Sequence, residues 1–343
     1  MKRSVIFIAV AACFLTSACA QKDTATSGSV AQEYLNLWLK EYHPEARANA
    51  SGIYILEDEA GTGAVWDKDI LYSLLTVTIR TLNGTISTVG HEGFAKQLGT
   101  YAQGNYYGPS VTFTSTGYAG VEALLEGMRA GGTRTAIIPA WLLTTDRYST
   151  QEEYLDACSS VSSLIYTITF AGQFEDLAKW EQENVKQYAS STFGSLMKPA
   201  VFNDATKEAD IFYFYTLGNI KNQKDTLERG KKYTLNYTGR LLNGQVFDTT
   251  EEKVAKDNGI YSSDRTYAPV TITSAESYEN YALDGNTSLV DGFKGALSLM
   301  KYEGEKSVAV FTSDLGYLSS GSGLKIPPYA PLRFDFEIVA VSE

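Results

Sequence analysis

The sequence predicts an α+β protein with two similar domains, each an antiparallel β-sheet that carries a short helix on one face. Three observations support this prediction. The same succession of helix, strand, turn and helix patterns occurs twice, the expected strands alternate apolar and polar residues, and the expected helices place apolar residues three or four positions apart. Tyr and Phe are abundant, with 23 and 15 residues, whereas Met and Cys number only 4 and 3, which is typical of sheet-rich domains.

Two alignments define the repeat. The segment TIRTLNGTIS (78–87) matches TGRLLNGQVF (238–247), 160 residues later. The segment VEALLEGMRAGGTRTAIIP (121–139) matches FKGALSLMKYEGEKSVAVF (293–311), 172 residues later. The larger second offset indicates about a dozen extra residues in the second copy, within 249–288, where a loop absorbs them at little cost in stability.

A helix is expected before each copy, over 31–42 and 174–188. In the second of these, Leu177, Trp180 and Val185 lie near helical spacing. Each helix is interpreted either as a spacer packed on its own domain or as a dimer surface.

The second copy shows its elements most clearly. Residues 233–242 alternate apolar and polar side chains, the pattern of a half-buried strand, and Asn243-Gly244 predicts a tight hairpin turn. Apolar side chains spaced three or four apart then predict a helix over 290–302. The remaining expected strands are 245–248, 307–312 and 332–341. This order of strands, one short helix and strands predicts an antiparallel sheet with its helix on one face.

Three segments of the second copy occur in a specific order and spacing. They are YTGRLLNGQVFD (237–248), LVDGFKGALSLMKYEGEK (289–306) and SDLGYLSSGSGLKIPPYAPLRFDFEIV (313–339). Together they resemble consecutive signatures of the FKBP-type peptidyl-prolyl cis-trans isomerase family, over about residues 208–343. The resemblance implies a five-stranded antiparallel sheet wrapped around a short helix, with an aromatic pocket between them.

The resemblance also implies a site and a reaction. It assigns catalytic roles to Tyr237, Phe247, Asp248, Tyr317 and Phe334, and substrate binding to Val290, Phe293 and Ile326. The Val290 N–H and the Tyr317 hydroxyl would donate hydrogen bonds to the substrate chain, and Asp248 would lie near the twisting carbonyl. No metal or cofactor is expected, because an X-Pro bond isomerises by rotation over a barrier of about 18–20 kcal/mol. Taken singly, the aromatic residues would be core residues, and Asp248 would be a turn residue.

Two positions depart from the family pattern. Phe293 stands where many members have Trp at the pocket floor, so we expect a pocket of altered depth. Leu318 follows Tyr317 where Gly is usual, so we expect the next loop to take a different path. The long segment 249–288, acidic and rich in Tyr, is interpreted as a solvated surface excursion rather than a flap that grips clients.

The first copy has the frame of the fold without its pocket. The positions that correspond to Tyr237, Phe247, Asp248 and Phe293 hold Val77, Ser87, Thr88 and Val121. We therefore expect an FKBP-like fold without isomerase activity over about residues 50–172, serving as a spacer, a client-binding surface or a dimer contact.

The N-terminus has the layout of a secretory signal peptide. Basic residues precede an apolar run over 5–15, which is too short to span a bilayer, and Thr16-Ser17-Ala18 leads into Cys19. We expect Cys19 to be lipidated after removal of residues 1–18, with ordinary cleavage beside an incidental cysteine as the alternative. The protein is then expected in the cell envelope, anchored to a membrane at its periplasmic face or outer surface.

These features divide the chain and limit its partners. The expected parts are a signal peptide (1–18), a lipidated tether (19–30), a helix with the degenerate domain (31–172), a linker helix (173–207) and the isomerase domain (208–343). The net charge of −11 argues against nucleic acid as a partner. His43 and His91 have no Cys or His neighbours in sequence and are interpreted as surface residues rather than metal ligands. Proline-containing polypeptide clients are the expected partners, and the oligomeric state is not indicated. The competing roles are a foldase, a non-catalytic client-binding module, and a component of a surface assembly.

Overall fold

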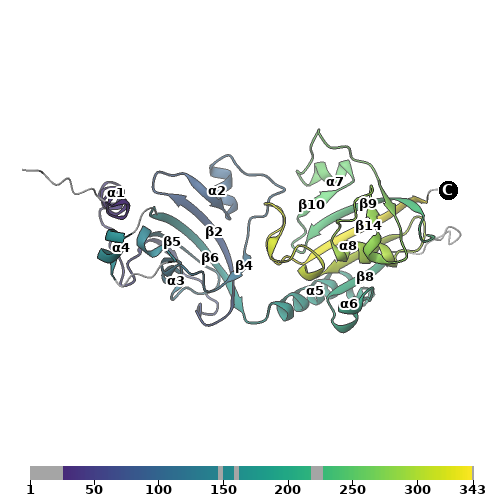
Figure 1. Cartoon of the computed structure of the whole chain (residues 1–343), viewed down its shortest axis with the longest axis horizontal. Coiled ribbons are helices and arrows are strands. Elements are labelled where there is room, and N and C mark those ends of the chain that lie inside the picture. The colour runs from purple at the N-terminus through teal and green to yellow at the C-terminus, as the bar shows by residue number, and fades with distance from the viewer. Residues whose placement is uncertain (1–25, 146–149, 158–161, 218–226, 342–343) are drawn as a thin grey trace, which may run out of the picture.

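A computed structural model describes residues 26–145, 150–157, 162–217 and 227–341. Cys19 and the signal segment lie outside these ranges. Two lobes are joined by helix α5 (Leu177–Phe193), and each lobe contains one antiparallel sheet, so the α+β prediction is confirmed (Figure 1). Within the described part of the chain, no helix is both long enough and apolar enough to cross a bilayer.

The N-terminal domain is a six-stranded sheet with one helix in its concave face. Leu124 and Leu125 of the helix are fully buried against Ile138, Ile168 and Phe170 of the strands. The strands run in the order β1 (Tyr54–Glu59), β5 (Gly132–Ile138), β6 (Leu164–Phe174), β2 (Tyr72–Thr81) and β3 (Ile86–Val89), and β4 (Ser110–Phe113) also pairs with β2. The helices are α2 (Glu92–Gln97), the core helix α3 (Ala119–Leu125), the short η1 (Ala140–Leu142) and α4 (Gln151–Ala157).

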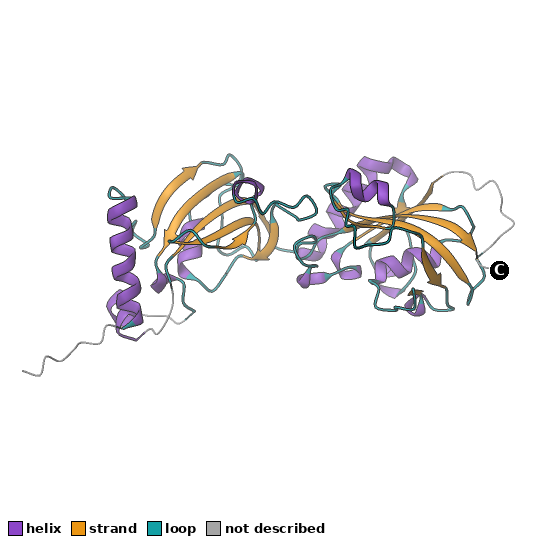
Figure 2. Ribbon diagram, turned by 90° about the horizontal axis from the view of Figure 1, so that it is seen from above, coloured by secondary structure: helices purple, strands orange, loops and turns teal. Residues whose placement is uncertain are grey.

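Helix α1 (Ser27–Tyr42) packs on this domain. Leu35 and Leu39 are buried against Ile137 and Ile165, and the Trp38 indole donates a 2.8 Å hydrogen bond to the carbonyl of Leu82. The helix stands beside the sheet at the end that lies away from the C-terminal lobe (Figure 2). The helix therefore packs on its own domain through Leu35 and Leu39, while Leu37 stays exposed.

The C-terminal domain is an eight-stranded sheet, larger than the five strands expected. Its strands run in the order β12 (Ala282–Leu283), β11 (Val270–Thr273), β9 (Lys232–Leu241), β14 (Leu332–Val341), β13 (Lys306–Phe311), β8 (Phe212–Leu217) and β7 (Lys198–Pro199), with β10 (Val246–Thr249) paired to β9. Its helices are α6 (Asp204–Glu208), α7 (Glu252–Asp257) and α8 (Asp291–Leu299), with short turns η2 (Gly194–Leu196), η3 (Tyr278–Asn280), η4 (Ser313–Leu315) and η5 (Leu318–Ser320). Because β7 pairs with β8, residues 198–199 belong to this sheet rather than to the linker helix expected over 173–207.

The two sheets have the same order of corresponding strands. Strands β1-β5-β6-β2, with β3 and β4, correspond to β8-β13-β14-β9, with β10 and β11. Details also recur 160 residues apart: the stacked pair Tyr101–Tyr107 has its counterpart in Tyr261–Tyr267, both with ring centroids at 5.5 Å. Strands β4 and β11 keep this spacing of 160, so the extra residues of the second copy lie after β11, within 274–290.

Helix α5 is attached to the C-terminal domain through a buried carboxylate. Glu181 is 2% exposed and accepts hydrogen bonds from the Ser313 N–H (2.6 Å) and from its hydroxyl (2.7 Å). Val185 of the same helix packs against Tyr213 and Val308. Burial raises the pKa of Glu181 to about 7, although the hydrogen bonds from Ser313 oppose this shift. The helix is thus part of the domain that carries η4.

The interpretation of His91 as a surface residue is wrong. Its ring is half-buried, with Nδ1 2.8 Å from the Thr78 hydroxyl of β2 and Nε2 3.0 Å from the Thr169 hydroxyl of β6. Burial lowers the pKa of His91. His91 therefore joins two strands. A sequence pattern could not show this, because its partners Thr78 and Thr169 lie 13 and 78 positions away in the sequence. No group of three His, Cys, Asp or Glu side chains suited to a metal ion occurs among the described residues.

Candidate active site

A cavity of about 320 Å³ lies between the C-terminal sheet and the first turn of α8. All eight residues that the sequence assigned to a pocket line it: Tyr237, Phe247, Asp248, Val290, Phe293, Tyr317, Ile326 and Phe334. They come from β9, β10, the N-terminus of α8, the loop after β13, and β14. The fold thus brings together residues that are up to 97 positions apart in sequence.

The floor of the cavity is a cluster of rings packed edge to face. The Phe293 ring, 4% exposed, lies 5.4 Å from Tyr237 and 5.1 Å from Phe334, with interplanar angles of 90° and 87°. Phe247 meets Phe334 at 5.6 Å and 82°. Such perpendicular arrangements are the favoured geometry of aromatic pairs. The result is an apolar floor whose rings hold one another in place.

The hairpin places two of these residues. The turn at Asn243-Gly244 closes with Gly244 at φ 90°, which glycine adopts without strain, and β10 then returns along β9. At Gly239 a Cβ atom would lie 2.5 Å from ring carbons of Phe247 and 2.9 Å from Phe334. Glycine is required there because the two aromatic rings occupy the space above the strand.

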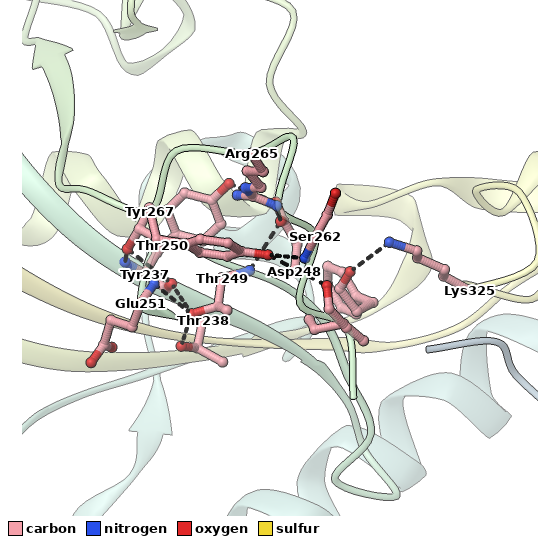
Figure 3. Close-up of polar contacts among 12 residues, drawn as sticks. Tyr237, Thr238, Asp248, Thr249, Thr250, Glu251, Ser262, Arg265, Tyr267 and Lys325 are labelled. Atoms are coloured by element: carbon pink, nitrogen blue, oxygen red, sulfur yellow. Dashed lines mark hydrogen bonds and ion pairs between the residues drawn. The ribbon is translucent and has the colours of Figure 1, made fainter. Parts of the chain in front are cut away.

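One wall of the cavity is a polar cluster centred on Asp248 (Figure 3). The Tyr237 hydroxyl donates a 2.6 Å hydrogen bond to one carboxylate oxygen of Asp248, and Arg265 forms an ion pair with the other. The Arg265 guanidinium also lies over the Tyr267 ring, 5.3 Å from its centroid. Burial, and then the charge and hydrogen bond of Asp248, raises the pKa of Tyr237, so its hydroxyl stays protonated.

Sequence reasoning missed Arg265. The residue belongs to the segment 249–288 that was interpreted as a solvated excursion, and it lies 17 positions beyond Asp248. The only arginine of an acidic, Tyr-rich segment was the available signal, but only the folded loop shows that it pairs with the pocket carboxylate. Leu283 and Ser288 of the same segment line the cavity, so the segment is partly a wall of it.

Two further groups that line the cavity are hydrogen-bond donors. Val290 is the N-cap of α8, where helix geometry leaves N–H groups without intrahelical partners. Tyr317 is half-buried, and burial, followed by the charge of Asp248, raises the pKa of its phenol. Leu318, at the position where Gly was noted as usual, has φ 48°, the left-handed conformation that glycine favours. The substitution is thus accommodated by a backbone conformation that is uncommon for Leu.

The comparisons with known proteins agree with this geometry. The sequence profile described as FKBP-type peptidyl-prolyl cis-trans isomerase matches residues 223–339. An FK506-binding protein of Neisseria meningitidis serogroup B is 34% identical over 115 residues, which cover 34% of this chain and 84% of that relative. The chain belongs to the FKBP-type peptidyl-prolyl cis-trans isomerase family.

Two further similarities have lower sequence identity. The macrophage infectivity potentiator of Trypanosoma cruzi is 30% identical over 112 residues, which span 33% of this chain but only 44% of that relative. The crystal structure of a peptidyl-prolyl cis-trans isomerase from Pseudomonas syringae pv. tomato covers 50% of this chain and 100% of its own, with 22% identity and a TM-score of 0.31.

Among the described residues of the N-terminal domain there is no counterpart of the FKBP polar cluster. The positions of Tyr237, Asp248 and Phe293 are taken by Val77, Thr88 and Val121, which line a separate cavity of about 530 Å³. Ser87, at the position of Phe247, does not line that cavity, and its hydroxyl lies 3.4 Å from the carbonyl oxygen of Ile79. These four positions therefore hold none of the phenol, carboxylate and aromatic groups of the FKBP pocket, and the expected lack of isomerase activity in this domain stays a prediction.

Proposed function

We propose that the pocket of the C-terminal FKBP domain isomerises X-Pro bonds in polypeptide clients. The observation that carries this proposal is one cavity that combines an aromatic floor with Tyr237 and Asp248, whose carboxylate is held by an ion pair with Arg265. Ion pairing and hydrogen bonding hold the Asp248 carboxylate in one orientation at the edge of the pocket. The reaction needs no nucleophile, since no covalent bond changes.

The chemistry follows from the electronic change during rotation. A planar amide has charge-separated resonance, which is lost when the bond twists. A pocket with aromatic walls solvates the planar form poorly, and donors that fit the twisted form bind the transition state more tightly than the ground state. The Val290 N–H and the Tyr317 hydroxyl are the donors assigned to the substrate chain. Without catalysis, exchange takes tens to hundreds of seconds, so acceleration matters for folding.

Refolding of a protein limited by X-Pro isomerisation tests this proposal. The full chain is expected to accelerate the slow refolding phase, and Asp248→Ala to lose most of that acceleration. Asp257→Ala is a matched control, because Asp257 is an exposed residue of α7, paired with Lys253 outside the pocket. Binding of the unfolded protein without acceleration of its refolding would favour the rival function, a client-binding module. Two features support that rival: Phe293 at a position where many family members have Trp, and the loss of the pocket residues in the N-terminal domain.

We further propose that the protein acts on exported proteins while anchored by lipid at Cys19. The support is the sequence Thr16-Ser17-Ala18-Cys19 after a short apolar run, followed by a polar stretch suited to a tether. Cys19→Ala is expected to move the protein from the membrane fraction to the soluble fraction of the cell envelope. An unchanged membrane fraction would contradict the anchor but not the isomerase.

A further inference from the structure

A neutral groove runs between the two domains. Its main cavity is the one of about 530 Å³ on the N-terminal domain, and a second cavity of about 410 Å³ continues it toward α5. The two cavities share Tyr106, Val111, Pro327 and Pro328, so they form one elongated depression, which we call the interdomain groove.

Two hydrogen bonds fix the walls of the groove relative to each other. The Tyr106 N–H donates to the carbonyl of Leu324 at 2.7 Å, and the Gln245 amide donates to the carbonyl of Gly104 at 3.0 Å. Both join the N-terminal loop after α2 to the FKBP domain. Figure 1 shows the yellow loop of the FKBP domain on the side that faces the N-terminal lobe.

The composition of the groove indicates what it binds. None of the described residues that line its two cavities is charged, although the chain has a net charge of −11. Apolar and aromatic side chains such as Val77, Leu324 and Trp180 alternate with hydroxyl and amide groups such as those of Thr112 and Asn184. An extended polypeptide offers both apolar side chains and backbone groups that need hydrogen-bond partners, and this lining serves both.

The groove and the isomerase pocket adjoin one and the same loop of the FKBP domain. Ser322, Lys325 and Ile326 line the pocket, whereas Gly323, Leu324 and the Pro327-Pro328 pair line the groove. The two sites are therefore the two sides of a single seven-residue segment. A polypeptide long enough to pass around this loop can therefore contact both sites.

The small residues of the N-terminal domain explain why space is available there. Where the FKBP domain has Tyr237 and Phe293, the groove has Val77 and Val121, and its cavity is about 530 Å³ rather than about 320 Å³. Loss of the aromatic and charged groups removes the isomerase chemistry but leaves a wider apolar depression at the same place in the fold.

We propose that the interdomain groove is a second binding site, which takes a neutral, apolar segment of the same polypeptide whose proline occupies the isomerase pocket. The proposal rests on the proposed function of that pocket for the identity of the client. Holding a second segment raises the effective concentration of the proline near the pocket, so long unfolded clients bind more tightly than short peptides.

The test is binding of a fluorescein-labelled, proline-free peptide rich in Phe, Leu and Ser to the full chain, followed by fluorescence anisotropy. Val77→Tyr fills the groove with the residue of the corresponding FKBP position. Leu324→Glu places a charge on its wall, and since Leu324 is 72% exposed, this variant is expected to fold. Leu196→Glu is the matched control, because Leu196 is 61% exposed and lies outside the groove.

Both groove variants are expected to weaken peptide binding about tenfold or more, which corresponds to about 1.4 kcal/mol, while Leu196→Glu binds as the wild type does. Absence of binding to the wild type, or unchanged binding to Leu324→Glu, overturns the proposal. So does binding that is lost in Asp248→Val but kept in Val77→Tyr, because the peptide would then occupy the isomerase pocket. A dimer of the wild type that Leu324→Glu dissociates would instead identify a second copy as the occupant and also overturn it.

Isomerisation of a short Phe-Pro peptide by the wild type, measured in parallel, separates the two proposals. Failure of that reaction contradicts the proposed function whether or not the groove binds peptide. Failure of proline-free peptide binding contradicts the groove while the isomerase stands.

Discussion

Glu181 makes the stability of the chain depend on pH, and the burial of this carboxyl determines whether stability rises or falls as the pH increases. Burial raises the pKa of this carboxyl from 4.5 to about 7, against the opposing hydrogen bonds from Ser313. In the unfolded chain the group ionises near its ordinary pKa, so between about pH 4.5 and 7 the folded state binds more protons than the unfolded state. The free energy of unfolding is therefore highest below this window and falls as the pH rises through it. A pKa difference of this size between the folded and unfolded states corresponds to a change of roughly 3 kcal/mol in the free energy of unfolding.

Urea denaturation of the full chain, at several pH values between about 5 and 8, measures this effect. Glu181→Gln has nearly the same shape and keeps an acceptor for Ser313, but it does not ionise. It is therefore expected to lose most of the decline in stability that the wild type shows over this range. Glu183→Gln is the matched control, because Glu183 is an exposed residue of the same helix. An equal decline in the wild type and in Glu181→Gln would refute the assignment of this pH dependence to the buried carboxyl.

Three other predictions concern the pocket. Arg265→Leu removes a partly exposed ion pair to Asp248, so kcat/KM for a Phe-Pro peptide should fall about tenfold while the melting temperature changes little; unchanged kinetics would exclude Arg265 from the site. Gly239→Ala places a Cβ 2.5 Å from Phe247, and urea denaturation should show a loss of about 1–3 kcal/mol together with reduced activity; wild-type stability would show that the rings move freely. Phe293→Ala removes the buried floor and should cost about 3–5 kcal/mol by the same measurement, whereas a loss below about 1 kcal/mol would contradict its place in the core.

Local sequence patterns correctly predicted the elements that depend on residues close together in the sequence, such as a strand with alternating side chains or a tight turn with glycine. The strand expected over 332–341 is β14 with the same bounds, because apolar and polar residues alternate from Leu332 to Ile338. The Asn243-Gly244 turn was predicted because glycine is favoured at the positive φ that this turn requires.

The helix predicted over 290–302 is shorter at both ends. Val290 is its N-cap rather than a helical residue, and α8 ends at Leu299. The Glu305 carboxylate accepts hydrogen bonds from the backbone N–H groups of Lys301 (2.6 Å) and Tyr302 (3.2 Å), which holds these residues outside the helix. Apolar spacing alone could not reveal this competition.

Contacts between segments that are distant in the sequence could not be predicted from sequence patterns. Arg265 reaches Asp248 from a loop, and Glu181 reaches Ser313 across 132 positions. The spacing of residues in helices and strands predicts neither contact, since one member of each pair lies in an irregular segment. The same reason applies to the interdomain groove, whose walls come from two domains and the helix between them. The family resemblance supplied the pocket residues, but the groups that orient them required the fold.

Isomerisation of a short Phe-Pro peptide by the full chain tests the central claim most directly. The account predicts that the folded wild type accelerates exchange, and that Asp248→Val and Tyr237→Phe each reduce the acceleration without loss of the fold. Tyr237→Phe removes only the hydroxyl that donates to Asp248 at 2.6 Å, so it isolates the polar cluster from the aromatic floor. A folded wild type that does not accelerate exchange, or variants that match it, would contradict the assignment of catalysis to this pocket.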